Sequence, residues 1–153
     1  MKIEVTNQVS QHTVAVMKEN VTMAEISLLA TEGLQKVFGF LAQHRIKVVG
    51  APYLAYMNSN ADFTQFDVEL GIPVNEDVAV SGEFFMSKNC EGKAVTVIHK
   101  GAYMDVEVAY MALMGYMAEN NLESTGVYYD YYLNDPADTL ESELLTQVVF
   151  PIR

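Results

Sequence analysis

The sequence predicts an α+β fold made of a duplicated β-α-β-β unit, with pseudo-twofold symmetry, an antiparallel sheet and two long helices. The first observation is an internal repeat, because a Gly, two Tyr and an Asn recur in register between Gly50–Asn58 and Gly126–Asn134. The second is that Glu69–Val74 and Gln147–Ile152 match at a proline and at the aliphatic residues around it. We therefore expect a single domain over residues 1–153, with repeats of about 1–76 and 77–153.

The first repeat shows a strand followed by a helix. His12–Val16 alternates between polar and apolar residues, as a half-buried strand does. Thr22 and Glu25 have the spacing of a capping box, which predicts a helix start, and the helix should end near Arg45 before the turn at Gly50. The residues expected on the inner stripe of this helix are Ile26, Ala30, Leu34, Val37 and Leu41.

The second repeat has the same order of elements. Lys93–Val97 alternates like the first strand, and Asp105 lies near the start of a helix, where the helix dipole favours a negative charge. Asn120 and Asn121 should end that helix. Its inner stripe is expected to comprise Val106, Tyr110, Leu113, Met114 and Met117.

Three further strands complete the prediction. Two lie at about 126–133 and 144–152, separated by the turn-forming Asn134–Asp138. A third is expected at Val78–Met86. Two such units, each with a helix on one face of a sheet, predict a cleft where the units meet.

Composition limits the classes of function. Half of the 153 residues are hydrophobic and 19% are charged, which is typical of an ordered globule. No apolar stretch reaches the length of a membrane span, and the N-terminus lacks a secretory pattern, so we expect a cytoplasmic protein. The net charge of −11 argues against direct contact with nucleic acid. Cys90 lies in an apparent turn and is interpreted as inert.

Motifs for metals and cofactors are absent from the sequence. His12, His44 and His99 do not have the spacing of metal ligands, and no nearby cysteine complements them. There is no phosphate-binding glycine loop, dinucleotide fingerprint or nucleophile elbow. We therefore expect no metal and no cofactor.

Strand alternation groups the candidate ligand-binding residues. Tyr128, Asp130 and Tyr132 point to one face of their strand, and we expect this face to look into the cleft, since an unpaired carboxylate beneath a helix would be costly. Tyr56 is equivalent to Tyr132 in the first repeat. Aromatic faces and a half-buried carboxylate together favour a cation. The alternative is that these tyrosines are ordinary strand residues and that the carboxylates are solvated.

Two other candidates and a group of methionines extend this set. Glu69 and Gln147 occupy equivalent places near the ends of the two repeats, and Glu69 would supply a second negative charge. The methionines are Met104, Met111, Met114 and Met117, and they form either an adaptable pocket wall or part of the core. For Met114 and Met117 the core is favoured.

Three segments resemble the GyrI-like, or AraC-type effector-binding, domains: His99–Tyr103, Tyr128–Pro136 and Thr146–Ile152. The resemblance covers nearly the whole chain. It implies a duplicated fold that binds small molecules, often lipophilic cations, and it adds Tyr103 to the candidate residues. Members occur as effector domains of AraC- and MerR-type transcription regulators and as stand-alone proteins. This chain looks like the stand-alone form, without a DNA-binding module.

Two departures from the family pattern bear on chemistry. Asp130 stands where the family often has Glu, and Gln147 stands where it commonly has Glu. Some relatives are similar to hydrolases of cyclopropane-containing toxins that use paired carboxylates, so Gln147 argues against such catalysis here. The alternatives to ligand sensing or sequestration are a small hydrolase and a gyrase-inhibitor-like interaction protein. The macromolecular partners considered are DNA gyrase, a separate regulator and a second copy of the chain.

Overall fold

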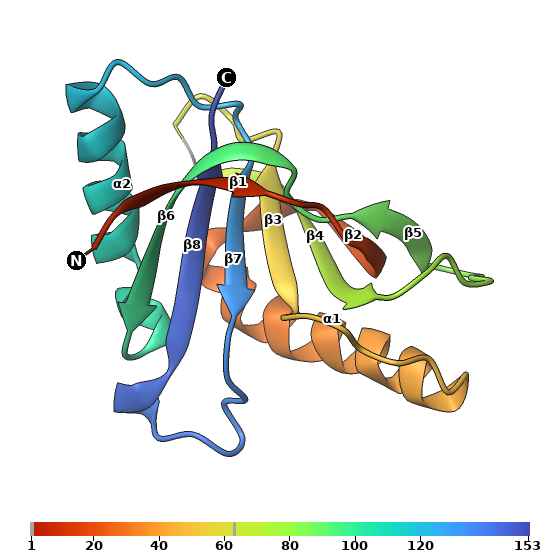
Figure 1. Cartoon of the computed structure of the whole chain (residues 1–153). Coiled ribbons are helices and arrows are strands. Elements are labelled where there is room, and N and C mark those ends of the chain that lie inside the picture. Colours follow the sequence, from red (N-terminus) through yellow and green to blue (C-terminus); the bar gives the residue numbers. More distant parts are fainter. Residues whose placement is uncertain (1, 63) are drawn as a thin grey trace. The chain divides into compact units, whose positions relative to one another are not determined.

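The computed structural model describes residues 2–62 and 64–153, and in this part it contains eight strands and two α-helices. The chain forms two compact units, one of Ser10–Asn89 and the other of the residues up to Val9 together with Cys90–Arg153 (Figure 1). Each unit has a four-stranded antiparallel sheet and one α-helix. The predicted α+β class with a duplicated unit is confirmed.

The unit of Ser10–Asn89 has the strand order β3-β4-β2-β5, with every pair antiparallel. Helix α1 packs against β4 and β2 of this sheet (Figure 1). The elements of this unit are β2 (His12–Thr22), α1 (Met23–Gln43), β3 (Tyr53–Met57), β4 (Gln65–Val74) and β5 (Phe85–Lys88).

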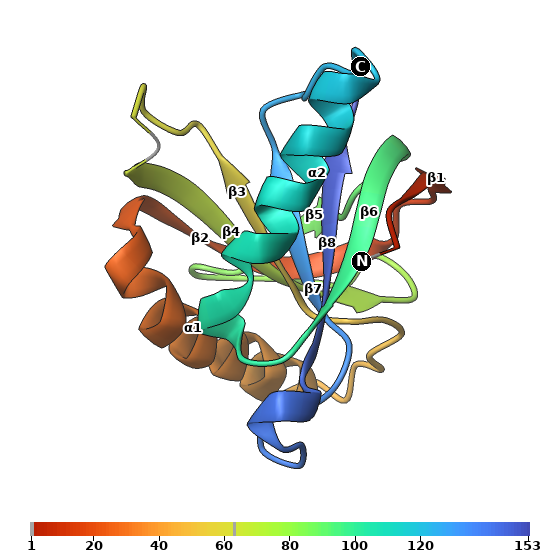
Figure 2. The ribbon, with the colours of Figure 1, turned by 90° about the vertical axis from the view of Figure 1, so that its left-hand side faces the viewer.

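The unit that contains Cys90–Arg153 has the strand order β1-β6-β8-β7, also antiparallel throughout. Helix α2 lies against β6 and β8, as Figure 2 shows. The elements of this unit are β1 (Glu4–Gln8), β6 (Gly92–Lys100), the 3-10 helix η1 (Tyr103–Asp105), α2 (Glu107–Glu119), β7 (Tyr128–Tyr132), the 3-10 helix η2 (Glu141–Glu143) and β8 (Leu145–Pro151).

The edge strands differ from the sequence expectation. β1 lies within the first predicted repeat but pairs with β6 of the second, and β5 lies within the second predicted repeat but pairs with β2 of the first. Sequence reasoning did not predict β1. The strand expected at Val78–Met86 is wrong, since the structure forms β5 only from Phe85 onward. A turn at Gly82, where φ is +65°, interrupts the chain before that strand can begin.

Helix α1 begins where the capping box predicts. The Glu25 carboxylate accepts hydrogen bonds from the backbone N–H of Thr22 at 3.0 Å and from its hydroxyl at 2.8 Å. These bonds, the backbone one first, lower the pKa of Glu25. On the inner side of the helix, a Cβ on Gly33 would lie 2.7 Å from Cδ2 of Leu70, so glycine lets α1 approach β4 closely.

Helix α2 buries Ala109, Leu113 and Met117 in the core of its unit. The core expectation is therefore confirmed for Met117 and wrong for Met114, which is 51% exposed. These buried residues are four apart, and Met114 lies one position outside the stripe that they form. Met104 and Met111 are also exposed. No described helix is both long enough and apolar enough to span a membrane.

Candidate functional site

The three alternate residues Tyr128, Asp130 and Tyr132 lie on the sheet face that α2 covers. Opposed residues in an antiparallel pair point to the same face, and Asp130 lies opposite Val148. Val148 belongs to the core cluster that includes Leu113 of α2, and Tyr128 packs against the same cluster. The expectation that this set faces away from its helix is therefore wrong.

The carboxylate of Asp130 is paired with a tyrosine of the helix above it. The Tyr110 hydroxyl lies 2.6 Å and 2.7 Å from the two Asp130 oxygens, so both oxygens share its single proton. Asp130 is only 3% exposed. A hydrogen bond to a charged group contributes about 1.5–3 kcal/mol, which offsets part of the cost of removing the carboxylate from water.

Tyr110 is the residue that sequence reasoning missed as part of the site. The sequence predicts its position on the inner stripe of α2 but does not link its hydroxyl to a carboxylate on a strand. The signal was available, because a tyrosine on the buried side of a helix generally has a polar partner for its hydroxyl.

Aromatic rings lie on both sides of the buried carboxylate along β7. On one side the Tyr128 ring is 4.6 Å from that of Phe150, which is also 5.5 Å from Tyr110. On the other side the Tyr132 ring is 5.1 Å from that of Tyr103, in η1. The structure thus brings four of the seven predicted site residues together on one face of one unit, with Tyr110 added.

Two buried polar atoms at the Tyr132 end have no hydrogen-bond partner among the described residues. They are the hydroxyls of Tyr103 and Thr146. Thr146 is 1% exposed and lies opposite Tyr132 in the β7–β8 pair. Burial, followed by the charge of Asp135, raises the pKa of Tyr103, so its phenol keeps its proton. Each unsatisfied buried hydroxyl costs about 1–3 kcal/mol.

Gln147 lies on the opposite face of the same sheet. It pairs with Tyr131, one residue out of phase with Asp130. On that face it borders a surface pocket of about 160 Å³, whose other lining residues are Lys2, Glu4, Thr96, Val97 and Ile98. The structure therefore does not place Gln147 beside Asp130.

In the unit of Ser10–Asn89, Tyr56 and Glu69 lie on opposite faces. Leu70 contacts α1 at Gly33, so Glu69, its neighbour in β4, points away from the helix. Tyr56 lies opposite Val68, which shares the face of Leu70. The structure does not bring these two predicted residues together.

Glu69 is held by hydroxyl groups. Its Oε2 accepts hydrogen bonds from the Tyr53 hydroxyl at 2.6 Å and from the Ser87 hydroxyl at 3.0 Å. Because Tyr53 gives its proton to Glu69, Thr13 must donate in the 2.9 Å contact between the Thr13 and Tyr53 hydroxyls. A Cβ on Gly71 would lie 2.5 Å from the Tyr53 hydroxyl, so only glycine lets this ring lie across β4.

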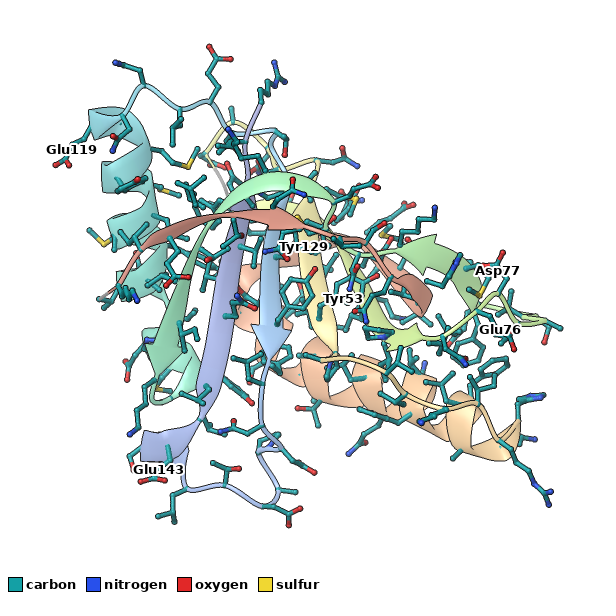
Figure 3. The ribbon with its side chains drawn as sticks, viewed as in Figure 1. Tyr53, Glu76, Asp77, Glu119, Tyr129 and Glu143 are labelled. Atoms are coloured by element: carbon teal, nitrogen blue, oxygen red, sulfur yellow. The ribbon has the colours of Figure 1, made fainter. Side chains whose placement is uncertain are left out.

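The strand registers confirm that Glu69 and Gln147 are equivalent positions. Glu69 lies opposite Ala55, and Gln147 lies opposite Tyr131 at the same place in the second pair of strands. Tyr53 and Tyr129 are equivalent in the same way and are labelled on β3 and β7 in Figure 3.

No group of His, Cys, Asp or Glu within the described ranges could hold a metal ion. Cys90 is buried, and burial raises its pKa to about 11, so the thiol stays protonated at neutral pH. Its backbone N–H donates to the Tyr131 hydroxyl at 3.0 Å. These features give Cys90 a structural role.

The chain combines a duplicated β-α-β-β fold with a buried carboxylate that lies among aromatic rings. The family model of the GyrI-like small molecule binding domain matches residues 2–153, and the chain belongs to this family. A search of curated protein sequences found no match.

Solved structures with low sequence identity share the fold. The C-terminal domain of EcmrR is 18% identical, with a TM-score of 0.80 over 99% of this chain and 97% of that one. The EcmrR chain solved in a complex with DNA is also 18% identical, with a TM-score of 0.83 over 99% of this chain. The present chain spans only 57% of the length of that EcmrR chain.

Two other structures extend the comparison. A hydrolase encoded by lin2189 from Listeria innocua is 13% identical, with a TM-score of 0.70 over 99% of this chain and 92% of that one. SAV2435, solved with bound tetraphenylphosphonium, is 10% identical, with a TM-score of 0.69 over 100% of this chain and 94% of that one.

Proposed function

We propose that the chain, as a single effector-binding domain over residues 1–153, binds lipophilic or aromatic cations in ligand sensing or sequestration. The observation that carries this proposal is the buried Asp130 carboxylate, paired with Tyr110 and lying between aromatic rings. The tetraphenylphosphonium bound to SAV2435, which has the same fold, supports a cation of this class.

The chemistry follows from the burial of the carboxylate. Away from water, a carboxylate interacts more strongly with a cation than an exposed one does. A ligand cation takes the place of the Tyr110 hydroxyl beside the carboxylate, and Tyr110 keeps its proton. The faces of Tyr128 and Tyr132 add about 0.5–2 kcal/mol each, depending on desolvation. A neutral compound of the same shape gains the aromatic contacts but not the charge interaction.

The remaining parts of the proposal follow the sequence expectations. Glu69, Tyr56 and Gln147 stay predictions from the sequence, to be tested by substitution, and we expect little effect at Glu69 because two hydroxyl groups already donate to its carboxylate. The likeness to EcmrR, which has been solved in complex with DNA, supports a link to transcription regulation. A cytoplasmic location is part of the same proposal, and the free thiol of Cys90 is compatible with it.

Titration calorimetry with tetraphenylphosphonium and with neutral triphenylphosphine oxide tests the proposal. We expect the cation to bind at least about tenfold more tightly, the factor that corresponds to about 1.4 kcal/mol. Equal affinity for the two compounds, or no binding of the cation, would contradict it.

A further inference from the structure

The Tyr132 end of the site contains polar groups that a simple aromatic cation cannot use. Thr146 is 1% exposed, and its hydroxyl has no hydrogen-bond partner among the described residues. The Tyr103 hydroxyl is buried and unsatisfied in the same way. A hydroxyl both donates and accepts, so these two atoms can satisfy an alcohol, an amide or a carbonyl of a ligand.

These hydroxyls belong to the same face as Asp130. Thr146 lies opposite Tyr132 in the β7–β8 pair, and the Tyr103 ring packs against that of Tyr132 at 5.1 Å. Asp130 precedes Tyr132 by two residues, which makes Asp130 and Thr146 diagonal neighbours across the two strands. Diagonal neighbours of this kind are about 7–8 Å apart, which one phenyl ring can span.

Resting on the proposed function, we infer that the preferred ligand is a cation with a neutral hydrogen-bonding group one ring length from its charge. Asp130 binds the cationic centre, and the hydroxyls of Thr146 and Tyr103 bind the neutral polar group. These two residues therefore determine specificity among cations, while Asp130 determines the preference for cations over neutral molecules.

The test compares two phosphonium ions of equal charge and nearly equal shape. One is triphenylphosphonium carrying a 4-(hydroxymethyl)phenyl group, and the other carries a 4-ethylphenyl group. In calorimetry we expect the wild-type protein to bind the hydroxymethyl compound about five- to tenfold more tightly, as one or two hydrogen bonds of ordinary strength provide.

The variants Thr146→Val and Tyr103→Phe each remove one hydroxyl and little volume. We expect each to bring the ratio of the two affinities toward one. Thr146→Ser is the matched control, because it keeps the hydroxyl at the same position and removes only the methyl group. It should keep the wild-type ratio.

A second measurement is independent of any ligand. Replacing an unsatisfied buried hydroxyl by a methyl group of the same shape removes a desolvation cost, so Thr146→Val should raise the melting temperature of the ligand-free protein. A lower melting temperature would show that the hydroxyl already has a partner and would overturn the inference.

The calorimetric outcomes separate the inference from the proposed function. If wild type binds both phosphonium ions equally, or if Thr146→Val keeps the wild-type ratio, the inference is wrong and cation binding stands. If wild type binds neither compound nor tetraphenylphosphonium, the proposed function fails and the inference fails with it.

Discussion

The two units each bury a carboxylate that accepts a hydrogen bond from a tyrosine hydroxyl, but they do so on different faces of similar sheets. Asp130 lies beneath α2 and is bound by Tyr110 of that helix. Glu69 lies on the face away from α1 and is bound by Tyr53 of the neighbouring strand and by Ser87. The same scaffold therefore holds one carboxylate through a helix and the other through its own sheet.

This difference indicates that the two carboxylates differ in how easily each can be released from its tyrosine partner. Tyr53, Thr13 and Ser87 all lie on β-strands of the sheet that carries Glu69, so releasing that carboxylate would disturb the sheet itself. Tyr110 lies in the first turn of α2, whose N-terminus has no side-chain hydrogen bond to cap it. We therefore expect the Asp130–Tyr110 pair to open with less disturbance of its sheet than the Glu69 pair.

The largest expected effect separates the two carboxylates by binding. Asp130→Asn should weaken binding of tetraphenylphosphonium at least about 30-fold, because a buried charge pair loses one of its charges. Glu69→Gln should change the affinity less than about threefold, since Glu69 is committed to two hydroxyl donors. Calorimetry on both variants measures this. A comparable loss in Glu69→Gln would instead support a site that uses two carboxylates.

The second prediction tests how Glu69 is held. Gly71→Ala should lower the free energy of unfolding by about 1–3 kcal/mol, because the new methyl group would overlap the Tyr53 ring. The matched control is Gly39→Ala on α1, where a Cβ meets no atom within 4 Å. This change should raise stability by up to about 1 kcal/mol. Urea denaturation measures both free energies of unfolding. An unchanged free energy of unfolding in Gly71→Ala would mean that the Tyr53 ring moves freely.

The sequence predicts the fold well because its signals are periodic and local. Alternation and the repeat place β2, β6 and β7, and the matched Tyr53 and Tyr129 fix equivalent registers in both units. The capping residue Thr22 places the start of α1 to within a residue. By contrast, β1 and β5 are short edge strands whose pairing depends on distant segments, and local patterns do not encode such pairing.

The site could be predicted only in part, for one physical reason. Alternation correctly grouped Tyr128, Asp130 and Tyr132, but it cannot say which face the helix covers. That choice depended on the cost of burying a carboxylate, and Tyr110 offsets this cost from a separate element. The sequence likewise does not identify Thr146 as a site residue, because whether a buried hydroxyl has a hydrogen-bond partner depends on tertiary contacts.

The third prediction compares the two tyrosine partners. Tyr110→Phe should destabilise the ligand-free protein by about 1–3 kcal/mol and strengthen cation binding about three- to tenfold, because the ligand no longer displaces a hydroxyl. Tyr53→Phe should destabilise the protein similarly, yet leave the affinity within about twofold. Denaturation and calorimetry measure these effects. Weaker binding in Tyr110→Phe would show that this hydroxyl contacts the ligand and does not compete with it.

The smallest expected effect concerns the starts of the two helices. Glu25→Ala should lower the melting temperature slightly at neutral pH, because the carboxylate accepts two hydrogen bonds from Thr22. The pKa of Glu25 is lower in the folded chain than its ordinary value of 4.5. Its stabilising effect is therefore fully present above the ordinary value and is lost as the pH falls through the lowered pKa.

The difference in melting temperature between wild type and Glu25→Ala should accordingly shrink toward zero in acid. Glu32→Ala, an exposed site on the same helix, controls for the loss of one charge. Hydrogen exchange extends this comparison to α2, whose uncapped first turn should exchange faster than the capped first turn of α1. Equal protection of the two turns would contradict the expectation that the first turn of α2, which carries Tyr110, opens more easily than that of α1.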